Sequence, residues 1–383
     1  MTRSLLAVPA RHAALNLAYL VPGETGGMEV YARRLIPALR AERPELALTA
    51  IVAQELASEL RERPWCEGLR VVALPVPGRS RPRRVLAEQL LVARAARRAG
   101  ADVLHSLAST GPVVTGALAS VLTVHDVIYA SHPETHAGLL RFGMAALVPA
   151  SARAADRVVA DSAYTASELV ARLHVARDKI DVVPLGPGSD PSVARTPEPE
   201  LRARLGLGDD PLVLSVSARR PHKNLERLID AVKTLDEPAT LVLPGYPGPH
   251  DAALAARGGE RVRVLGWVSD ADLEGLYATA TCLAFPSLAE GFGLPVLEAM
   301  RRGVPVACSN LTSLPEVAGD AALLFDPLSV TDIATALARL LRDGALRDDL
   351  AARGRRQAAG FSWARTARGT LAAYDAALAR GGG

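Results

Sequence analysis

The sequence predicts an α/β protein built from two doubly wound domains. Along most of the 383 residues, short apolar runs alternate with longer segments of helical periodicity, which is the pattern of parallel βαβ units. This length is enough for two domains that each bury a full hydrophobic core. A stretch rich in proline and glycine, residues 185–208, interrupts the alternation and separates two series of predicted strands.

The first series predicts strands at residues 15–20, 46–52, 69–74, 103–105, 121–124 and 158–161, with helices such as 28–42 and 85–99 between them. The second series predicts strands at residues 212–216, 240–243, 262–265, 282–285, 304–307 and 322–325. We therefore expect an N-terminal domain at 1–185, a linker with a short helix at 186–210 and a C-terminal domain at 211–360. A last helix, 361–380, opens with Ser362 as its N-cap, and Phe361 and Trp363 are expected to be packing anchors.

Composition excludes several classes of protein. Aromatic residues make up only 4% of the chain and the formal charge is only +3, so a nucleic-acid platform is not expected. The three cysteines form no CxxC pair, which argues against structural zinc and disulfides and fits a reducing compartment. The first residues do not resemble a signal peptide, and no uncharged apolar run is long enough for a transmembrane helix. We expect a cytoplasmic protein.

An arginine cluster at 79–84, continued by Arg94, Arg97 and Arg98, has two interpretations. Such a cluster could touch an anionic membrane surface, because each arginine contributes about 1 kcal/mol near anionic lipid. The alternative, a solvated loop and helix face, is the more common structure for a run of charges.

Residues 286–303, PSLAEGFGLPVLEAMRRG, are the most informative stretch of the sequence. They follow the predicted strand 282–285 and combine a glycine turn with the start of a helix. Pro295 suits the first turn of a helix, where its missing N–H costs nothing. Gly291 and Gly293 permit positive φ and a close approach of the backbone to a ligand. A strand, a glycine loop and a helix N-terminus together predict a site for an anion or a crowded polar group.

Two glutamates accompany this loop, and they predict what the ligand carries. Glu290 precedes the glycines and Glu298 lies one turn into the helix. Ionised carboxylates accept hydrogen bonds from hydroxyl groups, so the pair predicts a ligand with sugars as well as phosphate. A nucleotide-sugar has a pyrophosphate, a ribose and a hexose. The alternative is a solvated helix residue and a loop charge, but the spacing, both glycines and the preceding strand favour a binding site.

Cations follow the strand predicted at 212–216. In the segment 217–224, SARRPHKN, Lys223 offers a point charge and Arg219 a planar fork. Cleavage of a nucleotide-sugar leaves an extra negative charge on the pyrophosphate, which such cations stabilise. A run of charges is often a solvated face, but this one stands at the carboxyl end of a strand, where open parallel sheets bind ligands. The sequence leaves open whether Arg219 or Arg220 reaches the phosphate.

In the N-terminal domain, two further groups follow strands. Gly26 and Gly27 precede the helix predicted from residue 28, and a glycine pair alone is usually a turn. His125 follows the strand 121–124, so it either caps the sheet or points at a ligand. His105 and Ser106 end the preceding strand and form a weaker candidate site.

A pair of aspartates, Asp270 and Asp272, raises the question of a metal-bound nucleotide. The helical spacing that follows favours a different interpretation, in which Ser269 or Asp270 is an N-cap and the acidic residues occupy the first turn. We therefore expect no metal site.

The run EGFGLPVLEAM at 290–300 resembles the donor-site motif of retaining glycosyltransferases of the GT-B fold, family 4. The resemblance covers most of the chain. It implies two Rossmann-like domains that face a central cleft, an acceptor bound by the N-terminal domain and a nucleotide-sugar bound by the C-terminal domain. It also implies that the last helix crosses back to the N-terminal domain.

The resemblance implies roles for individual residues. Glu290 and the amides after it would hold the donor sugar, and Glu298 would bind the ribose hydroxyls. The catalytic residues that we expect are His125, Glu290, Lys223 and Arg219. The donor-binding residues are Gly26, Gly27, Gly291, Phe292, Gly293, Leu294 and Glu298. The family normally has a glycine and then an arginine before this lysine, whereas here Ser217 and Ala218 occupy that area, which is why the arginine is not settled.

The predicted function is transfer of a hexosyl unit, with retention of anomeric configuration, from a nucleotide-sugar such as GDP-mannose or a UDP-hexose to a hydroxyl. The acceptor would be a glycan, a lipid-linked molecule or a small molecule, chosen by loops near 79–84 and 132–141. No cofactor and no metal are expected, since Lys223 and an arginine supply the charge. Two alternatives stay open, namely another GT-B enzyme such as a sugar-nucleotide epimerase or a sucrose-type phosphorylase, and a non-enzymatic sugar-binding protein.

Overall fold

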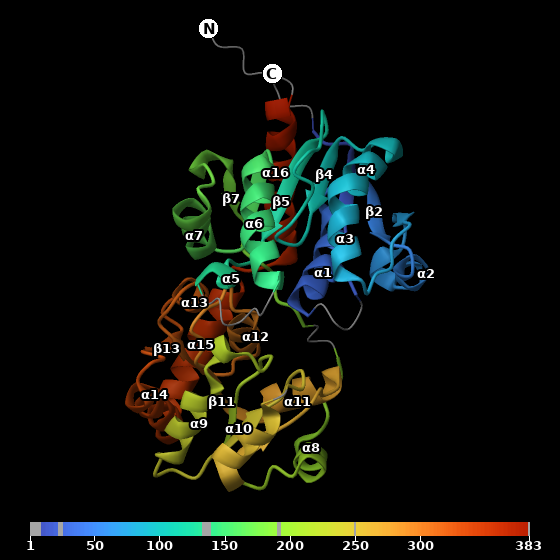
Figure 1. Ribbon diagram of the computed structural model, residues 1–383. Helices are drawn as coiled ribbons and strands as arrows, with labels where there is room; N and C mark the ends of the chain where they lie inside the picture. Colours follow the sequence, from blue (N-terminus) through green and yellow to red (C-terminus); the bar gives the residue numbers. More distant parts are fainter. Residues whose placement is uncertain (1–8, 22–25, 132–138, 190–192, 249, 382–383) are drawn as a thin grey trace. The chain divides into compact units, whose positions relative to one another are not determined.

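The computed structural model describes residues 9–21, 26–131, 139–189, 193–248 and 250–381, and these form two compact units (Figure 1). The N-terminal unit ends at Gly188 and resumes at Ser362, and the C-terminal unit runs from Ser189 to Phe361. Residues 1–8 and most of the predicted acceptor loop at 132–141 lie outside the described residues.

The N-terminal unit has a parallel sheet in the order β3-β2-β1-β4-β5-β6-β7. Its strands are β1 His12–Asn16, β2 Ala47–Ala53, β3 Arg70–Leu74, β4 Val103–Ser106, β5 Ala119–Val124, β6 Arg157–Ala160 and β7 Ile180–Val182. The order reverses between β1 and β4, which pair in register from Ala13 opposite Val103 to Asn16 opposite Ser106. This reversal is the switch point at which doubly wound sheets bind ligands.

The helices that cover this sheet include α1 Gly27–Glu42, α2 Leu56–Arg61, α3 Arg81–Ala87, α4 Ala93–Ala99, α5 Ile128–Ser131, α6 Leu139–Ala154 and α7 Ala163–Leu173. A single π-helical turn, Glu88–Val92, joins α3 to α4. Strand residues are buried almost throughout, because helices cover both faces of a doubly wound sheet.

The last helix, α16 Trp363–Gly381, belongs to the N-terminal unit, where it packs against α1 and β5 (Figure 1). Ser362 is its N-cap as predicted, because the backbone N–H of Arg365 donates to its hydroxyl. Asp375 accepts two hydrogen bonds from Arg43, at 2.9 and 2.7 Å, and fastens the helix to the end of α1. Trp363 is an anchor as predicted, since its indole N–H donates to the Pro187 carbonyl at 2.7 Å.

The C-terminal unit is also a doubly wound domain, and its parallel sheet has the order β10-β9-β8-β11-β12-β13. Its strands are β8 Leu212–Leu214, β9 Thr240–Leu243, β10 Val262–Val264, β11 Ala280–Phe285, β12 Val306–Ser309 and β13 Ala322–Phe325. Its helices are α8 Glu198–Leu205, α9 Leu225–Lys233, α10 Asp251–Gly258, α11 Asp270–Thr279, α12 Leu294–Arg302, α13 Leu314–Ala318, α14 Val330–Arg342 and α15 Gly344–Ala358. Here the order reverses between β8 and β11.

The two doubly wound sheets confirm the predicted fold class, while two strand assignments differ. The first strand spans His12–Asn16 rather than 15–20, because the buried residues Leu17 and Leu20 continue the apolar run beyond the sheet. The short edge strand Ile180–Val182 was not predicted. None of the helices in the described part of the chain is long and apolar enough to cross a membrane.

Candidate functional site

The ion pair between Lys223 and Glu290 marks the candidate site in the C-terminal unit. Lys223 ends a short 3-10 turn after β8, and Glu290 lies in the loop between β11 and α12. The two strands are neighbours at the switch point, so the loops at their carboxyl ends meet. Lys223 Nζ lies 2.5 Å from Glu290 Oε1, and the side chains are only 16% and 11% exposed. The structure therefore brings together two residues that lie 67 positions apart in the sequence.

The turn that carries Lys223 is fixed directly onto the segment before the glycine loop. Asn224 adopts a left-handed conformation, with φ of 57°, which asparagine tolerates better than most residues. Its buried amide donates to the carbonyls of Pro286, at 3.1 Å, and Pro327, at 2.7 Å. The backbone N–H of Leu288 donates to the His222 carbonyl at 2.7 Å. These bonds set the position of Lys223 relative to Glu290.

The glycine loop has the geometry that its sequence predicts. Gly293 has φ of 110° and precedes α12, and Pro295 lies in the first turn of that helix. A Cβ on Gly293 would lie 2.6 Å from a methyl carbon of Leu314, so the position needs glycine both for its φ and for space. The first turn of α12 faces this loop, and helix N-termini attract anions.

Two side chains that were not predicted from the sequence, those of Thr312 and Ser313, hydrogen-bond to the backbone of this loop. The hydroxyl of Thr312 accepts a hydrogen bond from the backbone N–H of Glu290 at 3.2 Å. The Ser313 hydroxyl lies 2.9 Å from the Phe292 carbonyl, to which it donates. Thr312 has φ of 60°, a strained conformation for a β-branched residue. Strained residues cluster at functional sites, and this strain could not be predicted from residue type.

The side chain of Phe292 packs inside the C-terminal unit. Its ring is buried and meets the ring of Phe361 edge to face, with centroids 5.8 Å apart. Phe361 is thus a packing anchor, as predicted. The predicted contact of Phe292 with a donor would therefore use its backbone amide, and the contacts of Gly291, Gly293 and Leu294 stay predictions.

Glu298 lies on α12 and is buried, with both carboxylate oxygens in hydrogen bonds. The backbone N–H of Ser189 donates to one oxygen at 3.0 Å, and the Tyr277 hydroxyl donates to the other at 3.1 Å. Burial raises the pKa of Glu298, and the nearby Arg302 guanidinium and these hydrogen bonds oppose the rise. A buried carboxylate held by two donors is a fixed acceptor rather than a solvated helix residue.

Arg302 donates to the backbone carbonyl of Glu298 and is itself paired with Glu274, and neither residue was predicted from the sequence. The guanidinium of Arg302 stacks 4.6 Å from the ring centre of Tyr277 and donates to the Ser189 hydroxyl at 2.6 Å. It also forms an ion pair with Glu274. Only the i to i+4 spacing of Glu298 and Arg302 on one helix could have suggested their proximity.

Arg219 is buried among backbone carbonyls, a position that was not predicted from the sequence. Its side chain is 1% exposed and its guanidinium donates to the carbonyls of Leu243, Leu265 and Tyr246. Asp251 lies 3.0 Å from its Nε. Arg219 therefore ties together the ends of β9 and β10, since all its donors point into the unit. Arg220 is exposed and lies three residues before Lys223.

The predicted residues of the N-terminal unit, Gly26, Gly27 and His125, do not share a unit with Lys223 and Glu290, so their roles stay predictions. Gly26 is the N-cap of α1, with φ of 56°, and Gly27 is its first residue. His125 has partners on both ring nitrogens: Nδ1 lies 2.7 Å from Asp161 and Nε2 donates to the Leu107 carbonyl at 2.9 Å. Burial alone would lower the pKa of His125, but the Asp161 carboxylate, the Leu107 carbonyl and Asp126 together outweigh it, so that the pKa is raised.

The weaker candidate, His105, is part of a buried network. Its Nδ1 lies 2.8 Å from the Tyr374 hydroxyl and its Nε2 lies 2.7 Å from the Thr123 hydroxyl. The Tyr31 hydroxyl meets Thr123 at 3.1 Å. Burial lowers the pKa of His105 to about 3, so the imidazole stays neutral. The network joins α16 to the sheet, so His105 has a structural role.

The aspartate pair forms the start of α11, as predicted. Ser269 is the N-cap and accepts from the backbone N–H of Asp272 at 3.1 Å. Asp272 in turn accepts from the Thr196 hydroxyl at 2.6 Å and pairs with Arg204. Among the described residues no group of three or more histidine, cysteine or acidic side chains is placed to hold a metal ion.

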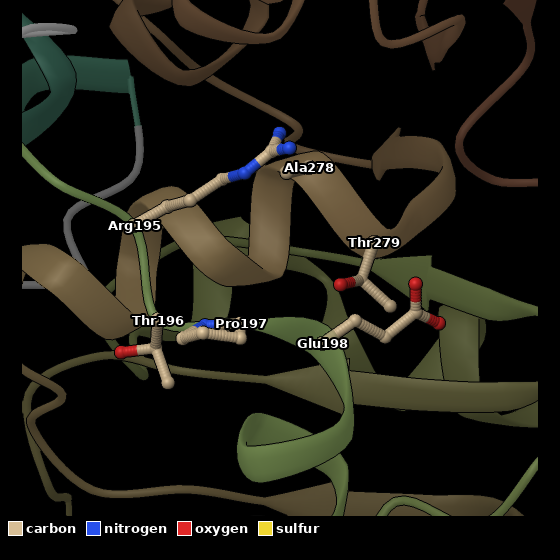
Figure 2. A pocket seen from close by; sticks show the side chains of 6 residues that line it. All are labelled: Arg195, Thr196, Pro197, Glu198, Ala278 and Thr279. Atoms are coloured by element: carbon tan, nitrogen blue, oxygen red, sulfur yellow. The ribbon is translucent and has the colours of Figure 1, made fainter.

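A cavity of about 360 Å³ lies between the start of α8 and the end of α11 (Figure 2). Its lining residues are Arg195, Thr196, Pro197, Glu198, Ala278 and Thr279. None of the residues predicted for the ligand site is among them, so we place the candidate site at the Lys223–Glu290 pair and not in this cavity.

Comparison with known proteins places both units in glycosyltransferase families. Residues 197–357 match the family Glycosyl transferases group 1, and residues 25–187 match Glycosyltransferase Family 4. O-antigen chain mannosyltransferase B of Escherichia coli is 36% identical over 267 residues, which cover 67% of this chain and 70% of that protein.

Two solved structures share the fold. Sucrose-phosphate synthase of Thermosynechococcus elongatus has a TM-score of 0.73 at 22% identity, covering 94% of this chain and 96% of that one. The Anabaena protein Alr3699/HepE, solved with UDP and glucose, has a TM-score of 0.71 at 19% identity, covering 94% and 97%. On its sequence and its fold, this chain belongs to the group 1, family 4 glycosyltransferases and is a hexosyltransferase of the GT-B fold.

Proposed function

We propose that this enzyme transfers a hexosyl unit from a nucleotide-sugar to a hydroxyl group, with retention of anomeric configuration. The observation that carries the proposal is the Lys223–Glu290 ion pair, set beside a glycine loop and a helix N-terminus at the switch point of the C-terminal sheet. Cation, carboxylate and backbone amides there match the pyrophosphate, the hydroxyls and the crowded sugar of one kind of ligand.

The donor's phosphates would meet Lys223 and Arg220. Lys223 is 16% exposed, so a ligand can reach its ammonium, and an incoming pyrophosphate would compete with Glu290 for it. Arg220 takes the place that we first gave to Arg219, because its side chain is exposed whereas the guanidinium of Arg219 is buried and donates to backbone carbonyls inside the unit. Both cations would stabilise the charge that develops on the departing diphosphate.

The donor's hydroxyls would meet the two glutamates. Glu290 would accept from the transferred sugar once Lys223 turns to the phosphate. Glu298 would accept from the ribose, because its carboxylate is already held in place by Ser189 and Tyr277 and needs no reorganisation. A fixed acceptor of this kind serves ground state and transition state equally, so Glu298 is a binding residue and not a catalytic one.

Retention follows from which groups are engaged. Inversion needs a general base behind the anomeric carbon, and double displacement needs a nucleophile on the same face. Glu298 accepts from two donors, both nitrogens of His125 have partners, and we assign Glu290 to the hydroxyls of the transferred sugar rather than to the anomeric carbon. We therefore propose a same-face attack in which the departing phosphate oxygen takes the proton of the acceptor hydroxyl.

The donor is GDP-mannose or a UDP-hexose. The E. coli relative is named a mannosyltransferase, and the Anabaena structure holds UDP and glucose, so the known proteins support either donor. The sequence around His125 resembles family members that use GDP-mannose. The acceptor would be a glycan, a lipid-linked molecule or a small molecule.

We also propose that the enzyme works in the cytoplasm. Cys66, Cys282 and Cys308 are free and buried, which suits a reducing compartment. Contact of the arginine-rich segment with a membrane is a separate proposal, since it does not depend on the donor chemistry.

The test is release of the nucleoside diphosphate from GDP-mannose, UDP-glucose and UDP-galactose in the presence of simple glycoside acceptors. A transferase forms a glycoside and GDP or UDP together. An epimerase converts the sugar, a phosphorylase needs inorganic phosphate, and a binding protein releases nothing. Transfer that is lost with Lys223→Met and kept with the exposed control Lys233→Met would support the proposed site, while equal activity of both variants would contradict it.

A further inference from the structure

One face of the N-terminal unit exposes an unusual group of apolar side chains. Among the described residues, five of the eleven large hydrophobic side chains that are exposed come from this face, and they are Val85, Leu86, Leu90, Val113 and Val114. Leu86 is 60% exposed, Leu90 65% and Val114 77%. We name these five residues the apolar patch. A solvated helix face would carry polar side chains at such positions.

The apolar patch is built from two segments that are fastened together. α3, the π-helical turn and α4 follow one another from residue 81 to residue 99 on one side of the N-terminal unit (Figure 1). Gln89 donates to the Gly111 carbonyl at 2.9 Å and accepts from the backbone N–H of Val113 at 3.0 Å. Arg97 donates to the Thr115 carbonyl. These bonds hold Val113 and Val114 beside the helix, so the five side chains form one surface.

The opposite side of the helix explains why these residues are not part of the core. Ala87, Val92, Ala93 and Ala96 are buried in the hydrophobic cluster under the sheet. These four residues form the face of the helix that packs into the core. Leu86 and Leu90, four residues apart, form a second apolar stripe that no other part of the described unit covers. Burying such a stripe is favourable only if another apolar phase covers it.

The exposed charges of the two segments that form the apolar patch all have one sign. Residues 79–99 contain seven arginines and a single acidic residue, Glu88, and residues 111–116 contain no charge. Glu88 is only 5% exposed and accepts a hydrogen bond from Asn16 at 2.7 Å, so it does not face the solvent. Arg81, Arg83, Arg94, Arg97 and Arg98 are exposed. Within these two segments the apolar patch is thus flanked by exposed cations and by no exposed acidic side chain.

We propose that the apolar patch and its arginine rim dock on the surface of an anionic lipid bilayer. Leucine and valine side chains would enter the boundary between headgroups and acyl chains, and the arginines would meet the lipid phosphates, for which their planar forks are suited. A protein partner with an acidic rim would be a different class of occupant. The lipid surface is favoured because a scattered cationic rim around shallow aliphatic side chains, without a groove or an aromatic anchor, suits a deformable apolar phase better than a fixed protein surface.

The test is co-sedimentation of the full chain with vesicles of phosphatidylcholine alone and of equal parts phosphatidylcholine and phosphatidylglycerol. Binding is expected only to the anionic vesicles and should weaken as salt is raised. The variant Leu86→Asn/Leu90→Asn should bind roughly tenfold or more weakly, since each side chain no longer transfers its apolar carbons into lipid. Leu328→Asn, at a leucine of the C-terminal unit that is 59% exposed, is the matched control and should bind like wild type.

The charge contribution has its own pair of variants. Arg94→Gln should weaken binding by roughly fivefold, and Arg356→Gln, at an exposed arginine of α15, should leave it unchanged. Hydrogen exchange of the wild-type chain, with and without anionic vesicles, supplies a readout that needs no variant. Protection should appear in residues 83–94 and 111–115.

Three results would overturn the proposal. The first is equal binding to both kinds of vesicle, or binding to neither. The second is full binding by the Leu86→Asn/Leu90→Asn variant. The third is a wild-type dimer that this variant converts to a monomer, because a second copy of the chain would then cover the apolar patch. None of them bears on nucleotide release, so the docking surface and the transferase activity fail or stand separately.

Discussion

Glu298 gives the sharpest prediction, because its contacts separate binding from folding. In Glu298→Gln, the amide oxygen can still accept from the Ser189 N–H and the amide nitrogen can donate to the Tyr277 hydroxyl. The fold should therefore keep its stability, especially as burial already disfavours the charged form and raises the pKa of Glu298. What the variant loses is the negative charge offered to the ribose.

The expected loss follows from the strength of hydrogen bonds. A hydrogen bond to a charged group contributes about 1.5–3 kcal/mol and one to a neutral group about 0.5–1.5 kcal/mol, so the change costs about 1–1.5 kcal/mol of binding free energy. Affinity for GDP or UDP should then fall roughly five- to twelvefold. Glu298→Ala should lose roughly ten- to a hundredfold, and it should also destabilise the fold because it leaves two buried donors unpaired at about 1–3 kcal/mol each.

Isothermal titration with GDP and with UDP measures the affinity, and urea unfolding measures the stability. Glu200→Gln, at an exposed carboxylate of α8, is the matched control, because it makes the same change of charge away from these contacts, and its nucleotide affinity should stay within about twofold of wild type. If Glu298→Gln binds the preferred nucleotide as tightly as wild type while its unfolding is unchanged, Glu298 is not a ribose ligand and the reasoning fails.

Three further predictions follow from the charges of the molecule. Transfer should persist in EDTA, because Lys223 and Arg220 supply the charge that a metal would, and activity that disappears in EDTA and returns with Mn²⁺ or Mg²⁺ would refute this. Arg219→Met should lower the free energy of unfolding by about 3–5 kcal/mol, since it leaves the three carbonyls that Arg219 binds without their donor, at about 1–3 kcal/mol each. Arg220→Met should leave unfolding within about 0.5 kcal/mol and weaken nucleotide binding roughly tenfold, and the reverse pattern would return the phosphate to Arg219. The pKa of His105 falls from 6.5 in the unfolded chain to about 3 in the folded one, so unfolding takes up a proton below pH ~6.5. The free energy of unfolding therefore decreases as the pH falls, by about 2 kcal/mol between pH ~7 and pH ~5. The stability gap between wild type and His105→Gln should narrow by this amount from pH ~7 to pH ~5, and a constant gap would show that His105 does not titrate on unfolding.

The sequence predicted the fold well where its period was regular. Runs such as 121–124 and 282–285 lie between clear helical segments, and both are strands at nearly those positions. It failed at residues 17–20, where an apolar run is buried as a loop rather than paired in the sheet. It also missed the edge strand Ile180–Val182, because three residues carry too little pattern to be distinguished from a loop.

Part of the candidate site was predicted from the sequence and part of it was not. Glu290, Gly293, Pro295 and Lys223 belong to local motifs, and their meeting follows from the adjacency of β8 and β11. The burial of Arg219 could not be predicted, because its partners, the carbonyls of Leu243, Tyr246 and Leu265, come from segments 24 to 46 residues further along the chain. No local pattern reveals such contacts.

The residues that hydrogen-bond to the two glutamates could not be predicted from the sequence either. Ser189 and Tyr277 reach Glu298 from segments 109 and 21 residues away, and Thr312 supports Glu290 in a left-handed conformation that threonine rarely adopts. Their roles depend on tertiary packing and on backbone strain, which residue types alone do not specify.

Proton and carbon NMR of the reaction with an α-linked nucleotide-sugar tests the central claim most directly. The anomeric signal of the donor should decline as free GDP or UDP appears, and a glycoside of the same α configuration, identified by its one-bond carbon–proton coupling, should grow at the same rate. Lys223→Met should slow all three changes together. A β-linked product, or sugar conversion without release of the nucleoside diphosphate, would contradict the account.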